Sequence, residues 1–322
     1  MVPQFPSFKR LELSDGPCVR SYTSQFAPFS DFNFGSLWAW DVKDHVEISQ
    51  LNDNLVVRFR HFVSDWPFYS FIGRHALERT AARLIERADK EGLDPRLELV
   101  PEAAASRLGA DTLHCEEDVD EADYVLGVER LQNYSGPMFS SKRGEVRKFL
   151  RCVAEPRVEC LDLADANTVR KLKKRFERWY QERPISGPLQ LDREFRAFER
   201  CLAAAPALRL IAVGVFVGRE LEAFSISEIT DASYACTYFE KADVTGFPGI
   251  GAFLNQQVAI VLAGFGIKYI NIEQDLGIAG LRQSKRSYGP VGYLRKFRVS
   301  QRALALPNVS VPAEQMALAF AP

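Results

Sequence analysis

Three glycines between a strand pattern and an apolar helix pattern constrain this chain more than any other feature. A β-type run ends at Glu240, and apolar residues at helical spacing fill residues 252–262. The glycines between them are Gly246, Gly249 and Gly251. Glycine tolerates positive φ, and the backbone N–H groups at a helix N-terminus attract anions. The segment therefore predicts either a plain turn or a loop that holds a phosphate or an oxyanion.

The order of strand and helix patterns is the same in both halves of the chain. The first half has strand-like runs at 46–49, 55–59 and 68–72, a helix pattern at 77–88, a strand at 97–100, a helix opened by Pro101 and a strand at 124–128. The second half has a hairpin at 208–217 and 221–228, a strand at 234–240, the glycine loop with its helix, a strand at 269–273, a helix at 279–287 and a strand at 291–299. Both halves read βββαβαβ. We therefore expect an α/β (α+β) protein with two tandem domains, each a mixed sheet flanked by helices.

A helical insert is expected between the two halves, over residues 142–204. Helix patterns cover 145–151, 165–183 and 191–204, and Asp165 is expected to cap the second of them. Gly136 and Pro137 interrupt the periodicity just before this insert. The expected domains are therefore residues 1–135 and residues 136–322, with the insert in the second.

Composition describes an ordinary folded protein. The 322 residues are 47% hydrophobic and 26% charged, with a formal net charge of −1, which gives no global argument for nucleic-acid or membrane binding. No apolar run approaches the roughly 20 residues that span a membrane, so a cytoplasmic location is expected. The six cysteines and four histidines show no metal-ligand motif, so no metal site is predicted.

Carboxylates follow two strands that are expected to be neighbours. Glu240 ends the strand before the glycine loop, where it could accept a proton from an acceptor amine or simply pair with Lys241. Glu273 and Asp275 follow the next strand, and one of them could hold the ammonium group of an acceptor.

Two cations and a tyrosine follow these carboxylates. Arg282 and Lys285 are three positions apart and share one helix face, where they could hold a terminal phosphate or a developing oxyanion, or could lie on a solvated surface. Tyr288 could donate a proton to a leaving oxygen or sulfur, or could pack beside Pro290. With Glu240 and Asp275, these three residues are the predicted catalytic group.

Basic residues are concentrated in the helical insert. Phosphate backbones are recognised mainly through such cations, although a basic helix face is also typical of a solvated surface. The candidates for tRNA binding are Lys142, Arg143, Arg147, Lys148, Lys173 and Lys174.

Several short motifs resemble one family. They are Phe-Glu-Lys-Ala-Asp at 239–243, Asn255-Gln256, Asn-Ile-Glu-Gln-Asp-Leu-Gly at 271–277 and Gly-Leu-Arg-x-Ser-Lys-x-Ser-Tyr at 280–288, with weaker matches at 32–34, 37–40 and 124–150. Together they resemble the bacterial family of unknown function that is similar to the C-terminal domain of phosphatidylglycerol lysyltransferases. The resemblance covers most of the chain.

The resemblance implies tandem GNAT-like domains and the transfer of an aminoacyl group from a charged tRNA to an amine or a hydroxyl. It also implies binding or catalytic roles for Arg282, Lys285 and Tyr288. The glycine loop resembles the pyrophosphate loop of acetyl-CoA-dependent GNAT proteins, with Gly246 in place of the polar first residue. The expected donor-binding residues are Gly246, Gly249, Ile250, Gly251 and Asn255.

The preferred hypothesis is an acyltransferase that moves an aminoacyl group from charged tRNA to a small soluble acceptor. Phosphatidylglycerol lysyltransferases carry a membrane portion that this sequence lacks, which makes a lipid acceptor doubtful. No tightly bound cofactor is expected, because the donor itself is a co-substrate. An acyl-CoA-dependent N-acyltransferase and a non-catalytic binding protein on the same fold are the alternatives.

Overall fold

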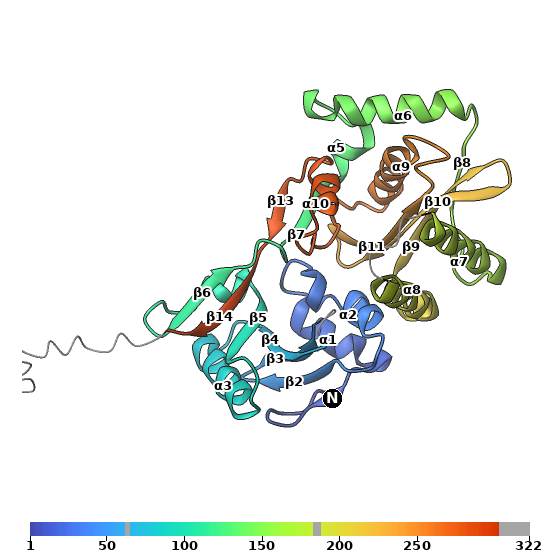
Figure 1. The fold of residues 1–322 in the computed structure, drawn as a ribbon. Helices are drawn as coiled ribbons and strands as arrows, with labels where there is room; N and C mark the ends of the chain where they lie inside the picture. The colour runs from blue at the N-terminus through green and yellow to red at the C-terminus, as the bar shows by residue number, and fades with distance from the viewer. Residues whose placement is uncertain (62–64, 183–187, 303–322) are drawn as a thin grey trace, which may run out of the picture.

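The computed structural model describes residues 1–61, 65–182 and 188–302 and contains two mixed β-sheets flanked by helices. Figure 1 shows two lobes, one for each sheet, joined where β13 and β14 pass from one to the other. Each sheet has seven strands within these residues. The expected fold class is confirmed.

The first sheet is built mainly from the N-terminal third of the chain. Its order is β1-β2-β3-β4-β5-β14-β6, and only the β4–β5 pair is parallel among the described strands. The strands are β1 (Lys9–Arg10), β2 (Glu47–Leu51), β3 (Asn54–Arg60), β4 (Pro67–Ile72), β5 (Arg96–Pro101), β6 (Leu113–Glu117) and β14 (Lys296–Gln301).

The second sheet has the corresponding order, β8-β9-β10-β11-β12-β7-β13, again with one parallel pair, β11–β12, among the described strands. The strands are β7 (Asp123–Gly127), β8 (Arg157–Cys160), β9 (Leu210–Val217), β10 (Glu220–Ile229), β11 (Tyr234–Ala242), β12 (Tyr269–Asn271) and β13 (Gly292–Leu294). The parallel pair occupies the same place in both sheets, which agrees with the duplication expected from the element order.

The two sheets exchange strands. β7 comes from the first half of the chain but pairs with β12 and β13 in the second sheet. β14 comes from the C-terminal end but lies between β5 and β6 in the first. The expected strand at 291–299 is therefore two strands in different sheets. The division at residue 135 needs a correction, because residues 123–127 and 296–301 belong to the sheets of the opposite halves.

The helices cover both sheets. In the first lobe they are α1 (Gly16–Thr23), α2 (Phe34–Trp40), α3 (Leu77–Lys90) and α4 (Glu102–Ala105); in the second they are α5 (Val128–Asn133), α6 (Ser140–Cys152), α7 (Ala166–Gln181), α8 (Pro188–Ala203), α9 (Ile250–Gly264) and α10 (Ala279–Arg286). Short 3₁₀ turns occupy Leu13–Asp15, Ser30–Phe32, Pro137–Phe139 and Ala205–Ala207. None of the helices in the described ranges is long and apolar enough to span a bilayer.

The expected helical insert is largely confirmed but contains a strand. α6, α7 and α8 form as predicted, although residue 183, the expected end of the second helix, lies outside the described residues. The Asp165 side chain accepts hydrogen bonds from the N–H groups of Asn167 and Thr168, which confirms it as the N-cap of α7. β8 between α6 and α7 was not predicted, since four residues are too few for a clear alternation.

Alternation along the strands of the second sheet directs side chains to two cores. Val213 and Val215 of β9 pack in the core that includes α9 and α6. Ala212 and Phe216 pack in the core that includes α7 and α8. The second sheet is therefore covered on both faces, with α9 on one face and α7 and α8 on the other (Figure 1).

The parallel strands β11 and β12 pair over three residues only. The pairing joins residues 234–236 to 269–271, after which β12 ends while β11 continues to Ala242 beside β10. The two strands separate beyond Cys236, so polar groups that follow them lie at the point of divergence.

Candidate active site

Glu240 lies on β11 beyond its pairing with β12, and its side chain meets α9. Asn255 of α9 donates from Nδ2 to Glu240 Oε1 at 2.7 Å. The same amide lies within hydrogen-bond distance of Gly251 O at 3.1 Å and Tyr288 Oη at 3.3 Å. Asn255 thus joins three of the predicted site residues, Glu240, Gly251 and Tyr288.

Lys142 of α6 completes this group. Its Nζ lies 4.2 Å from the centroid of the Tyr288 ring, and only 8% of the residue is exposed. The expected role of Lys142 in contacting tRNA does not fit this position, because the side chain is buried beside Tyr288. A cation over an aromatic face is attracted by the negative charge of the ring face. Lys142, named from the sequence only as a candidate for tRNA binding, therefore lies beside Tyr288 in the candidate site.

The environment of Glu240 favours its neutral form. Burial raises the pKa of Glu240 to about 7, although the hydrogen bond from Asn255 and the charges of Lys241, Lys142 and Lys285 act in the opposite direction. Burial also raises the pKa of Tyr288 well above its usual value, so that its phenol keeps its proton. A carboxyl group with a pKa near 7 can accept and return a proton at neutral pH.

The chain that follows β12 forms the other side of the site. Glu273 has a φ of +59°, rare for a residue with a side chain, and accepts a hydrogen bond from Ser36 Oγ at 3.0 Å. Burial raises the pKa of Glu273 to about 7. Ser36 belongs to α2, so the first lobe contributes to this site.

Lys285 of α10 bonds to the backbone of the segment that follows β12. Its Nζ donates to Ile272 O and, at 2.7 Å, to Gln274 O. Burial lowers the pKa of Lys285 to about 8, against the opposing effects of Glu273, Asp123 and Asp275. An ammonium group has three N–H bonds, so one remains for a ligand in this partly buried position.

Asp275 and Arg282, both predicted to be catalytic, are paired with each other. Arg282 Nε and Nη2 donate to the two oxygens of Asp275 at 2.8 and 2.7 Å, and Nη2 also donates to Asp120 at 2.5 Å. Tyr124 Oη and the N–H of Gly277 complete the shell of Asp275 at 2.6 and 2.9 Å.

This pairing changes the interpretation of both residues. Asp275 is fully buried, and the bonds from Arg282, with those from Tyr124 and Gly277, lower the pKa of Asp275 to about 2. A carboxylate that accepts these four hydrogen bonds is a weak base, because its lone pairs are already engaged by protein donors and are not free for an acceptor substrate. The geometry favours a positioning function for the pair, which fixes the segment between β12 and α10 behind Lys285.

A buried charge cluster fixes the end of β12. Lys296 Nζ of β14 lies 2.7 Å from Asp123 Oδ1 of β7 and 3.0 Å from Ser30 Oγ. Asp123 Oδ2 accepts from Asn271 Nδ2, the last residue of β12, at 3.0 Å. Both exchanged strands thus contribute a charge to this cluster, and breaking such a buried pair is costly. The cluster positions the segment that carries Glu273.

The glycine loop is shaped by its protein neighbours. Gly246 N donates to Asp243 Oδ1 at 2.7 Å, so that N–H is already bonded. Gly249 has a φ of +96°, and a Cβ there would lie 2.1 Å from Glu145 O of α6. Ile250 N bonds to Phe247 O at 3.0 Å.

A Cβ on Gly251 would meet only Val244, at 3.8 Å. Gly246 and Gly249 are thus explained by the fold, and the N–H of Gly251 in the first turn is the loop's remaining candidate for donor binding.

The basic candidates lie in different environments. Arg143 donates to Tyr134 O and Gly136 O at 2.5 and 2.7 Å and so fixes the turn before α6. Lys173 and Lys174 of α7 pair with Glu199 and Glu220. Arg147 and Lys148 are exposed, and Arg147 lines a groove on α6 with Gly144, Leu150 and Arg151. The six residues do not form one continuous surface.

The sequence reasoning missed several contributors besides Lys142. Ser36, Tyr124 and Asp120 contact the site residues from segments far away in the chain. The weaker motif matches at 32–34, 37–40 and 124–150 lie near them in the sequence. Their contacts depend on the strand exchange, which no local pattern reveals.

The two seven-stranded sheets with flanking helices have the architecture expected for two tandem GNAT-like domains. The family model for "Phosphatidylglycerol lysyltransferase, C-terminal" matches residues 24–300, and the chain belongs to this family. Its relatives are acyl- and aminoacyltransferases. No curated protein matches the sequence.

Solved structures agree with the fold. A conserved protein of unknown function from Bacteroides thetaiotaomicron superposes with a TM-score of 0.79 at 24% identity, over 94% of this chain and all of that one. The C-terminal domain of a putative lysylphosphatidylglycerol synthetase from Agrobacterium fabrum gives 0.59 at 10% identity, over 90% and 91% of the two chains. FemX gives 0.51 at 10% identity, over 91% and 96%. At these identities the similarity concerns the fold.

Proposed function

We propose that this protein transfers an aminoacyl group from a charged tRNA to an amine or hydroxyl of a small soluble acceptor. One observation carries the proposal: the partly buried carboxyl of Glu240, with a pKa of about 7, lies at the divergence of β11 and β12 within reach of Asn255. The family match and the similarity to FemX support an aminoacyl donor.

Glu240 acts as the general base in this proposal. The nucleophilic nitrogen or oxygen of the acceptor attacks the carbonyl carbon of the aminoacyl ester, and Glu240 accepts the proton that it loses. Asn255 holds one oxygen of the carboxylate and leaves the other for the acceptor. General base catalysis of this kind contributes about 10²–10⁴-fold to a rate.

In this proposal, N–H donors of the site stabilise the negative charge that develops on the carbonyl oxygen of the aminoacyl ester. The carbonyl oxygen becomes an oxyanion in the tetrahedral intermediate, and the third N–H of Lys285, with the N–H of Gly251, is positioned to stabilise it. Collapse breaks the bond to the ribose oxygen of the tRNA, which takes a proton from Tyr288. The phenolate regains a proton from solvent, and Glu240 returns the proton it accepted to solvent. No covalent enzyme intermediate is needed.

The direct test follows label from tRNA to acceptor. Bulk tRNA is charged with a mixture of radiolabelled amino acids and incubated with the protein and ethanolamine, putrescine or glycerol; an arm with phosphatidylglycerol vesicles and an arm with labelled acetyl-CoA run in parallel. We expect loss of label from tRNA above spontaneous hydrolysis, a new small labelled product, and formation of that product about 10²–10⁴-fold more slowly with Glu240→Gln. Transfer only to the vesicles contradicts the soluble acceptor, and transfer only from acetyl-CoA contradicts the donor.

A further inference from the structure

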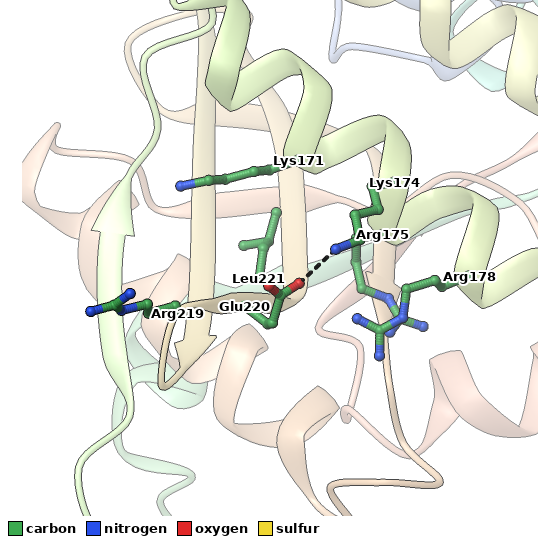
Figure 2. A pocket seen from close by; sticks show the side chains of 7 residues that line it. All are labelled: Lys171, Lys174, Arg175, Arg178, Arg219, Glu220 and Leu221. Carbon is green, nitrogen blue, oxygen red and sulfur yellow. Dashed lines mark hydrogen bonds and ion pairs between the residues drawn. The ribbon is translucent and has the colours of Figure 1, made fainter.

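A cation-lined cavity of about 160 Å³ lies between α7 and the β9–β10 hairpin, on the sheet face opposite Glu240. It is smaller than the roughly 300–1,000 Å³ of pockets that enclose drug-sized ligands, so it suits a single small group. Figure 2 shows its lining: Lys171, Lys174, Arg175 and Arg178 from α7, and Arg219, Glu220 and Leu221 from the hairpin.

Arg175 forms the floor of the cavity as a buried and incompletely bonded cation. Its side chain has no exposed surface, and its Nη1 and Nη2 pair with Glu222 at 3.2 Å and Glu182 at 2.7 Å. Its Nε is buried without a hydrogen-bond partner. A buried polar atom left unpaired is costly, and a guanidinium group matches the oxygens of a phosphate. The Arg175 guanidinium therefore adds positive charge beneath the cavity, although its buried atoms do not reach the cavity surface.

The rim adds further positive charge. Lys174 pairs with Glu220 at 3.0 Å, and Arg178 with Glu222 at 3.4 Å. Lys171 and Arg219 have no carboxylate within ion-pair distance among the residues the structure describes; Lys171 Nζ lies 5.5 Å from the centroid of the Phe216 ring. The cations therefore outnumber the carboxylates that compensate them.

The cavity lies at the same end of the sheet as the candidate active site. β10 begins at Glu220 and runs antiparallel to β11, with Ala223 opposite Ala242 and Ser225 opposite Glu240. The turn that carries Arg219 therefore projects from the end at which β11 finishes. A long polyanion with its reactive end near Glu240 could reach the opposite face by passing around this sheet end.

We propose that this cavity binds a backbone phosphate of the donor RNA, which rests on the proposed function. Lys171 holds the phosphate oxygens from α7 and Arg219 holds them from the hairpin, above the buried positive charge of Arg175. Phosphate contacts position a nucleic acid independently of its sequence, and each contact adds to the salt dependence of binding. The site therefore fixes the position of the RNA while the aminoacyl end reacts.

The test measures binding of bulk charged tRNA to the full chain at several salt concentrations. The variants are Lys171→Ala, Arg219→Ala and the double variant, and Arg170→Ala is the control, because Arg170 is exposed on the same helix but does not line the cavity. We expect each cavity variant to weaken binding about tenfold and to reduce the slope of log affinity against log salt by about 1. The control should keep the wild-type affinity and the wild-type slope.

A second arm separates RNA from a free phosphate. Inorganic phosphate, added at constant ionic strength against chloride, should compete with tRNA in the wild type and not in the double variant. Equal losses from Arg170→Ala and the cavity variants would overturn the proposal in favour of a diffuse basic surface. Unchanged tRNA binding in the double variant would also overturn it, leaving the proposed transfer intact, whereas absence of both tRNA binding and transfer in the wild type would remove the proposed function as well.

Discussion

Two carboxylates lie beyond the paired part of the parallel strands β11 and β12, and their surroundings give them opposite chemistry. Glu240, after the β11–β12 pairing, has one hydrogen-bond donor, and burial raises its pKa to about 7. Asp275, beyond β12, has four bonds from Arg282, Tyr124 and Gly277, and its pKa falls to about 2. The number of donors around a buried carboxyl therefore separates a candidate base from a structural anion, although the sequence pattern treats both alike.

The largest expected effect concerns Glu240. Glu240→Gln preserves the shape and the contact with Asn255 but cannot accept a proton, so the single-turnover transfer rate should fall about 10²–10⁴-fold. Glu194→Gln is the matched control, since Glu194 pairs with Lys241 on the other face of the sheet. A loss of less than about threefold, with donor binding intact, would remove Glu240 from the mechanism.

Asp275→Asn tests the other member of the comparison. It weakens the pairing with Arg282 while Asp120 still holds that guanidinium, so the free energy of unfolding should fall by roughly 2–3 kcal/mol in urea. The folded pKa of Asp275 is depressed, so its stabilisation is complete above its unfolded pKa near 4 and is lost as pH falls towards about 2. A normal unfolding free energy with abolished transfer would return Asp275 to the catalytic group.

Two of the three loop glycines, Gly249 and Gly251, provide a further contrast. Gly249→Ala should destabilise the fold by about 1–3 kcal/mol, because φ is +96° and the new Cβ meets Glu145 O. Gly249→Val would introduce the same clash with Glu145 O, so a loss of donor binding in that variant would not show that the loop binds the donor. Gly251→Ala meets only Val244 at 3.8 Å and should leave thermal unfolding unchanged or slightly improved. If both variants melt like the wild type, the contact with α6 does not explain Gly249.

The pH dependence of transfer should be bell-shaped. The rate should rise with pH as Glu240 loses its proton near 7 and fall as Lys285 loses its proton near 8. Glu240→Gln should remove the acid limb, and Lys285→Arg should move the alkaline limb upward. Glu273→Gln identifies the contribution of the other carboxyl with a pKa of about 7. An acid limb that survives in Glu240→Gln and disappears in Glu273→Gln would assign the base to Glu273.

Local patterns predicted most of the fold. The hairpin across Gly218, the N-cap at Asp165 and the helix after the glycine loop follow from turn chemistry, capping and periodicity, and all three formed. The exchange of β7 and β14 could not be predicted, because it depends on pairing between strands more than 140 residues apart in the chain. For that reason the expected division at residue 135 does not anticipate that β7 and β14 lie in the sheets of the opposite halves.

The site was predictable in part. The strand-end position of Glu240 and the helix position of Asn255 were clear, whereas a lysine in a basic helix gave no sign that Lys142 would be buried beside Tyr288. Arg282 was interpreted as a cation directed at substrate, since nothing in the spacing showed that Asp275 and Asp120 would both bond to it. The sequence therefore indicates which polar residues lie near the site. Tertiary contacts decide which of them are paired with other protein groups and which are free to contact a substrate.

The most direct test is a carbon-13 NMR titration of the side-chain carboxyl groups, with Glu240 and Asp275 assigned by comparison with Glu240→Gln and Asp275→Asn. The Glu240 resonance should titrate near pH 7, and the Asp275 resonance should remain that of an ionised carboxylate down to about pH 3. Titration of both groups near pH 4 would contradict the contrast between base and structural anion on which the mechanism depends.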